Sequence, residues 1–132
     1  MEISPQQRLQ IWKKCRTSEL YNEAEVRLDA CGAWIVFTDY NNPESPFGWE
    51  VDHIYPKAKL AELGIAEEKI NDIINLRALN IRNNRSKGVS YPVYTSKIAA
   101  LNDKQNHEVE KTLVVNQEKQ IELSNFYGLD ND

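Results

Sequence analysis

The sequence Gly48-Trp49-Glu50-Val51-Asp52-His53-Ile54-Tyr55-Pro56 decides the fold of this chain, together with Asn83-Asn84-Arg85-Ser86-Lys87-Gly88 further along. Residues 49–54 predict a strand that Pro56 ends. Residues 33–37 are a second aromatic and β-branched run, and the turn-rich segment 40–48 predicts a hairpin loop between the two. Residues 80–87 predict a helix that Gly88 closes in the left-handed conformation. We therefore expect a two-stranded hairpin and a helix at the centre of an α+β fold.

Helices are expected on both sides of this centre. Ser4 and Gln7 fit a capping box with Pro5 in the first turn, so a helix should run to about residue 16 with Leu9 and Trp12 on its apolar face. Residues 17–30 show no clear pattern, and we expect a loop there with at most one helical turn. At the other end, Asn116 predicts the cap of a last helix that ends before residue 128.

Shorter elements fill the remaining segments. Residues 57–63, stopped by Gly64, and residues 66–70 predict short helices. Residues 75–79 are expected to be extended or loop-like, residues 91–94 extended and residues 113–115 a strand. We expect one domain over residues 1–132, with a core motif at 48–88, an N-terminal helical extension at 1–30 and a C-terminal extension at 95–132.

Composition limits the class of protein. The 132 residues suffice for one hydrophobic core, and 41% hydrophobic and 27% charged residues are ordinary for a globular protein. No apolar run reaches the roughly 18 residues of a membrane helix, and residues 1–5 lack the features of a signal peptide. We expect a cytoplasmic protein without membrane contact, and the two cysteines exclude a disulfide framework.

The charge is unevenly distributed along the chain. Residues 103–132 carry seven acidic side chains and three lysines, which accounts for the whole formal net charge of −4. Residues 77–88 carry no acid and four bases: Arg77, Arg82, Arg85 and Lys87. An overall negative charge therefore does not exclude a nucleic-acid partner, because the basic residues gather in one segment.

The histidine behind a carboxylate at Asp52-His53, the mid-segment Asn75 and the ending Asn84-Arg85-Ser86-Lys87 resemble the HNH endonucleases. The resemblance extends over residues 48–88. It implies a ββα-metal fold, in which a two-stranded hairpin and a helix hold one divalent cation. It also implies a metal-dependent endonuclease that hydrolyses DNA phosphodiester bonds.

The resemblance also implies a role for each motif residue. His53 would be the general base, which suits an imidazole because its unperturbed pKa of about 6.5 leaves much of it neutral at pH 7. Asp52 and Asn84 would be the metal ligands, and Asn75 would brace the loop that presents His53. Asn83 is the rival of Asn84, which we prefer because it begins the family's N-x-x-K ending. On a strand Asp52 and His53 point to opposite faces, so one shared site requires a bend there.

The metal expectation follows from donor chemistry and from departures from the family. Carboxylate and amide oxygens suit Mg²⁺, or Mn²⁺, better than zinc. Many members of the family carry two CxxC pairs for a structural zinc, whereas Asn80 and Asn83 stand at the second pair and Cys31 alone lies near the first. We expect no structural zinc.

Duplex DNA is the expected partner, with Arg77, Arg82, Arg85 and Lys87 on its phosphates. Two alternatives remain open: a DNA-binding module that keeps the fold without turnover, and a nuclease that acts on RNA. The sequence leaves specificity and oligomeric state undetermined.

Overall fold

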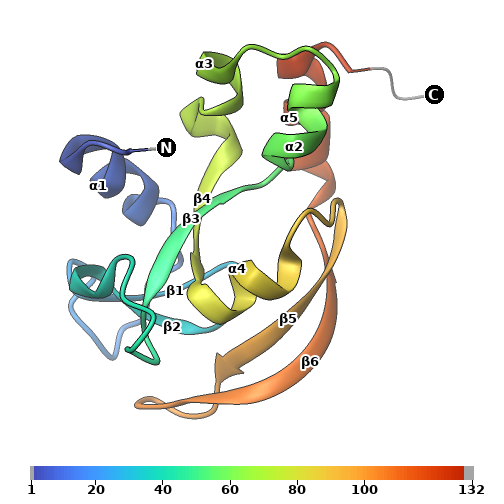
Figure 1. The fold of residues 1–132 in the computed structure, drawn as a ribbon. Coiled ribbons are helices and arrows are strands. Elements are labelled where there is room, and N and C mark those ends of the chain that lie inside the picture. Colours follow the sequence, from blue (N-terminus) through green and yellow to red (C-terminus); the bar gives the residue numbers. More distant parts are fainter. Residues whose placement is uncertain (1, 130–132) are drawn as a thin grey trace.

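The computed structural model describes residues 2–129 as an α+β fold (Figure 1). In chain order its elements are α1 (Pro5–Lys13), β1 (Val26–Leu28), β2 (Trp34–Val36), the 3₁₀ helix η1 (Phe37–Asp39), β3 (Trp49–His53), α2 (Lys57–Glu62), α3 (Glu67–Ile70), the 3₁₀ helix η2 (Ile73–Asn75), β4 (Leu76–Asn80), α4 (Ile81–Lys87), β5 (Val93–Ala100), β6 (Asn106–Val114) and α5 (Gln117–Tyr127). No helix in this range is long and apolar enough to cross a membrane.

The strands form three separate antiparallel pairs, β1–β2, β3–β4 and β5–β6. The predicted pairing of residues 33–37 with 49–54 is wrong. β2 pairs with β1, which lies in the segment predicted as a loop, and β3 pairs with β4 from Trp49↔Asn80 to His53↔Leu76. The β3–β4 pairing is favoured because it places Trp49, Leu76 and Ala78 together in one apolar cluster.

The β3–β4 pair presents two chemically different faces. Trp49 and Ala78 pack with Ile11 and Trp12 of α1 and with Ile35. The opposite face carries the charged side chains of β3, because residues at alternate positions share a face. Helix α4 covers this charged face and also packs against β5 (Figure 1).

Helix α4 begins directly after β4. The Asn80 side chain accepts a hydrogen bond from Arg82 N, which caps the first turn. Gly88 ends the helix with φ 53° and ψ −125°, so the predicted positive φ is present but not the left-handed helical conformation. The end of β3 and the body of α4 are thereby held side by side.

The flanking helices follow the sequence prediction with small changes. The capping box at Ser4 and Gln7 is present, but α1 ends at Lys13 and Leu9 is 43% exposed, so Leu9 is not part of the buried face. Asn116 caps α5, and Gly128 ends it in the left-handed conformation. A second apolar cluster, which includes Leu60 and Leu123, lies between α2, α5 and the end of β3.

Candidate active site

A cleft of about 510 Å³ lies where β3, α2 and α4 meet. Asp52 and His53 line it from the end of β3, and Asn84 lines it from α4. In the sequence the whole of α2, α3 and β4 separates Asn84 from Asp52 and His53. The fold therefore brings three of the predicted site residues to one place.

The imidazole of His53 is held by one side chain at this cleft. Its Nε2 lies 2.7 Å from Oδ1 of Asn71. A carbonyl oxygen only accepts, so Nε2 carries the hydrogen of the neutral ring and Nδ1 is the basic nitrogen. Burial lowers the pKa of His53 below its usual value, against the opposing effects of the Asn71 hydrogen bond and of Asp52. At neutral pH the ring is thus mainly in the form that accepts a proton.

Asn75 is fully buried and clamps the segment that follows His53. Its Oδ1 accepts from Tyr55 N at 2.8 Å, and its Nδ2 donates to Tyr55 O at 3.1 Å and to Ile70 O at 3.2 Å. These are contacts of the kind that the resemblance implies for this asparagine. That they contribute to catalysis remains a prediction.

Asp52 sits in the wall of the cleft inside a buried cluster of three charges. Its Oδ2 lies 2.9 Å from Nε of Arg77, and its Oδ1 lies 3.2 Å from Nζ of Lys87. Lys87 also donates to His53 O at 3.1 Å, so the same ammonium touches the backbone of the predicted base. Burial lowers the pKa of Lys87, which Asp52 counteracts. For Arg77 burial is the largest single effect and lowers the pKa, but Asp52, Tyr94 and Cys31 together outweigh it and raise the pKa.

This cluster changes what two of the predicted DNA contacts can do. The Lys87 side chain is fully buried, and that of Arg77 is only 15% exposed. In this conformation both cations form ion pairs with Asp52 and are not available to contact DNA on the surface. The structure thus leaves Arg82 and Arg85 as the predicted DNA contacts that face solvent.

Asn83 and Asn84 face opposite ways on α4. Asn83 is fully buried, donates to Asp29 Oδ2 and Ile98 O, and accepts from the backbone of residues 97 and 98. Asn84 donates from Nδ2 to Glu50 Oε1 at 2.9 Å, and its Oδ1 accepts no hydrogen bond from any described residue. Of the two, Asn84 alone lines the cleft and has an unused carbonyl oxygen.

Two residues that hydrogen-bond to side chains of the cleft had no predicted role. Glu50 orients Asn84, and its position two residues before Asp52 could have indicated it, because both lie on one face of the strand. Asn71 holds His53 from a turn after α3. No sequence pattern connects Asn71 with His53.

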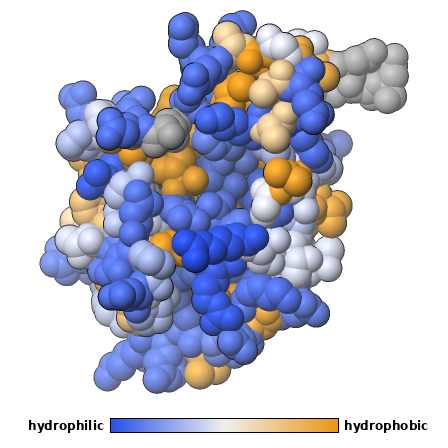
Figure 2. All heavy atoms as spheres, in the orientation of Figure 1, coloured by the Kyte–Doolittle hydropathy of each residue, from blue (hydrophilic) through white to orange (hydrophobic). Residues whose placement is uncertain are grey.

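The side chains of Arg82 and Arg85 are 56% and 66% exposed. Arg82 pairs with Glu108 at 2.9 Å, and Arg85 lies 4.0 Å from Glu50. Figure 2 shows hydrophilic side chains over α4 at the centre of this face. The acidic C-terminal segment is therefore partly folded against the basic one, while its last two acids, at 130 and 132, lie outside the described residues.

The donors at the cleft are one carboxylate and one amide carbonyl. No group of three or more His, Cys, Asp or Glu side chains within residues 2–129 is placed to hold a metal ion. A pair of oxygen donors nevertheless fits Mg²⁺, which usually keeps several waters and takes substrate phosphates as further ligands. Burial raises the pKa of Cys15 and of Cys31 to about 12, so both thiols are protonated at neutral pH.

Comparisons with family models, with curated proteins and with solved structures found no match for this chain. The resemblance to the HNH endonucleases therefore remains a prediction from the motif residues of the sequence.

Proposed function

We propose that this chain is a metal-dependent endonuclease of the HNH type that hydrolyses DNA phosphodiester bonds, with β3, β4 and α4 as its ββα-metal core. One observation carries the proposal. Asp52 and His53 line a single cleft with Asn84, which lies far from them in the sequence. The clamp that Asn75 forms on the segment after His53 supports it.

His53 would take the proton of the attacking water at Nδ1. Asn71 holds Nε2, which orients the ring and keeps the basic nitrogen on the other side. The lowered pKa of His53 keeps the base neutral at pH 7. Arg82 and Arg85 would contact phosphates and set the position of the strand.

Asp52 and Asn84 Oδ1 would hold one Mg²⁺ or Mn²⁺ ion. When bound, the cation stabilises negative charge on the phosphate and on the leaving oxygen. Each carboxylate oxygen has two acceptor sites, so Asp52 can keep Arg77 and Lys87 while it takes up a further partner. The proposed setting is the cytoplasm.

A plasmid-cleavage assay tests this function. Purified protein is incubated with plasmid DNA and with RNA, each with Mg²⁺, with Mn²⁺ and with EDTA. We expect metal-dependent DNA cleavage that falls about 10²- to 10⁴-fold in His53→Ala. His107→Ala is the matched control because it removes the other histidine, in β6, and should leave cleavage unchanged.

Two results would overturn the proposal: wild-type protein that cleaves neither DNA nor RNA with either metal, or His53→Ala cleaving as fast as His107→Ala. Cleavage of RNA alone would assign the activity to RNA.

The second candidate function is DNA binding without turnover. It is favoured by the occupation of both Asp52 oxygens by cations of the chain itself. DNA binding in Ca²⁺ that is equal in wild type and His53→Ala, together with no cleavage in Mg²⁺ or Mn²⁺, would establish it.

A further inference from the structure

We propose that a second pocket, between α1, β4 and the start of α5, binds the phosphate group of a small phosphate ester. The pocket has a volume of about 380 Å³ and shares no lining residue with the His53 cleft. This inference does not depend on the proposed nuclease function.

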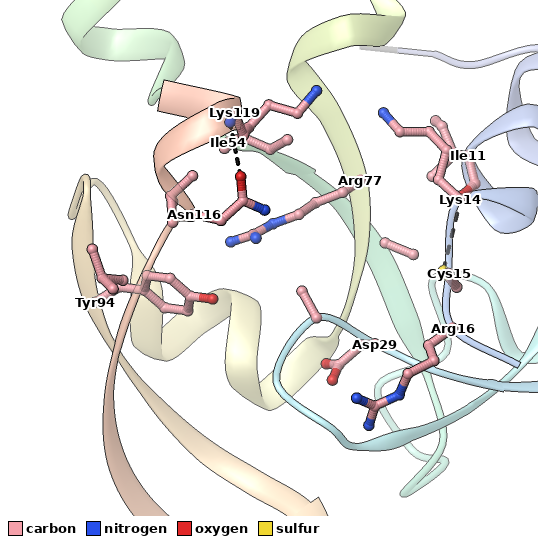
Figure 3. A pocket seen from close by; sticks show the side chains of 14 residues that line it. Ile11, Lys14, Cys15, Arg16, Asp29, Ile54, Arg77, Tyr94, Asn116 and Lys119 are labelled. Atoms are coloured by element: carbon pink, nitrogen blue, oxygen red, sulfur yellow. Dashed lines mark hydrogen bonds between the residues drawn. The ribbon is translucent and has the colours of Figure 1, made fainter. Parts of the chain in front are cut away.

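Three cationic side chains from three elements line this pocket: Lys14 follows α1, Arg77 lies on β4 and Lys119 lies on α5 (Figure 3). Helix α5 has 11 residues, and its cap Asn116 also lines the pocket. The positive end of the helix dipole therefore adds to the three cations. The chain as a whole carries −4, so this concentration of positive charge is local.

The guanidinium of Arg77 supplies an unused donor. Its Nε pairs with Asp52, but its Nη2 is buried and has no hydrogen-bond partner. Figure 3 shows the guanidinium extending into the pocket toward the side of Asn116 and Tyr94. A buried N–H without an acceptor is unfavourable, and an oxyanion in the pocket would satisfy it.

The two lysines each keep one donor for a ligand. Lys14 Nζ donates to the carbonyl oxygens of Ile73 at 2.9 Å and Leu76 at 2.6 Å, and Lys119 Nζ donates to Ile74 O at 3.1 Å and to Glu122. An ammonium has three N–H groups, so one remains on each. The backbone contacts hold both ammoniums in place.

Lys14 forms no ion pair with any described residue, whereas Arg77 pairs with Asp52 and Lys119 with Glu122. The pKa of Lys14 is lowered to about 8, chiefly by burial and then by Lys119, against a smaller raising effect of Glu122. Asp29 also lines the pocket, but its carboxylate accepts from the backbone N–H groups of residues 31, 33 and 80 and from Asn83. Arg16 adds a fourth cation to the lining.

The remaining wall favours an ester over a bare ion. Ile54, Tyr94 and Val115 line it with apolar surface, and all three are buried. A phosphate dianion would match the cations, while the organic part of the ligand would cover the apolar wall. The DNA backbone also carries phosphate groups, so the test compares a small phosphate ester with a DNA duplex.

An NMR titration of ¹⁵N-labelled protein at pH 7, without divalent metal, tests the pocket. The probes are adenosine monophosphate, inorganic phosphate, adenosine and a short DNA duplex. We expect saturable shifts of the amides of residues 14, 77, 116 and 119 with the monophosphate, weaker ones with inorganic phosphate and none with adenosine. Lys14→Met and Lys119→Met should each weaken binding of the monophosphate about tenfold, the loss of one charge-assisted hydrogen bond.

Lys104→Met, in the exposed turn between β5 and β6, is the matched control and should bind like wild type. Amide spectra of each variant report whether the fold is retained. Absence of saturable shifts with the monophosphate, or equal binding by the Lys14, Lys119 and Lys104 variants, would overturn the proposal. Shifts of these amides by the duplex but not by the monophosphate would overturn the assignment to a small ligand.

Discussion

Asn75→Ala should destabilise the fold strongly, because the side chain is fully buried and its three hydrogen bonds all go to backbone groups. Alanine leaves Tyr55 N and O and Ile70 O without this partner. Ile70 O keeps a contact of 3.4 Å with the Tyr127 hydroxyl, and Tyr55 is only partly buried. One or two groups therefore remain unsatisfied, at about 1 to 3 kcal/mol each.

We expect a loss of about 2 to 4 kcal/mol in the free energy of unfolding, which lowers the Tm by about 10 °C for a domain of this size. Urea denaturation followed by tryptophan fluorescence measures it, with linear extrapolation to water. Asn125→Ala, on the exposed face of α5, is the control and should stay within about 0.5 kcal/mol of wild type.

An Asn75→Ala variant as stable as Asn125→Ala would refute the reasoning, because the clamp would then contribute nothing to stability. If the clamp also positions His53, cleavage should fall in Asn75→Ala even at temperatures where the variant is fully folded. Full activity of the folded variant would limit Asn75 to a structural role.

Three further predictions concern the base, the two asparagines of α4 and the metal content. Single-turnover cleavage should rise with pH and level off, with a midpoint below the usual value of 6.5, because a lowered pKa makes the neutral base of His53 available at lower pH. A midpoint at or above 6.5 would contradict this. Asn84→Ala should raise the Mg²⁺ concentration for half-maximal rate with little change in Tm. Asn83→Ala should instead lower the Tm, since four hydrogen bonds of a buried side chain are lost. A larger effect of Asn83→Ala than of Asn84→Ala on the Mg²⁺ requirement would place the ligand at Asn83. EDTA should leave the Tm within about 1 °C and metal analysis should find no stoichiometric zinc, because Cys15 and Cys31 cannot supply a usual zinc ligand set; a Tm that collapses in EDTA would refute it.

The local signals in the sequence predicted individual elements well. Capping residues and glycines marked α1, α2 and α5, since these signals act within a few residues of the helix end. The pairing of β3 was predicted wrongly. β3 pairs with β4 because both strands pack apolar side chains against α1, and this packing depends on the tertiary structure. The β5–β6 pair was largely missed because β6 is mostly exposed and its polar residues give no strong alternation.

The same distinction applies to the site. The motif spacing was sufficient to name His53, Asn75 and Asn84, which the structure places at or beside the cleft. It could not show that Lys87 points inward, because a basic residue on a short helix is usually solvated and its burial depends on Asp52. The role of Asn71 could not be predicted for a similar reason, since only the tertiary structure brings it into contact with His53.

The pairing of Asp52 with two buried cations restricts how this chain can change over time. Replacement of Asp52 by an uncharged residue would leave Arg77 and Lys87 buried without their counter-ion, which typically costs about 3 to 5 kcal/mol out of a total of about 5 to 15. His53 and Asn84 each make a single side-chain hydrogen bond at the cleft and can be replaced at far smaller expense in stability. A descendant that loses the proposed catalysis yet remains a folded protein should therefore have changed at His53 or Asn84 and should still carry Asp52.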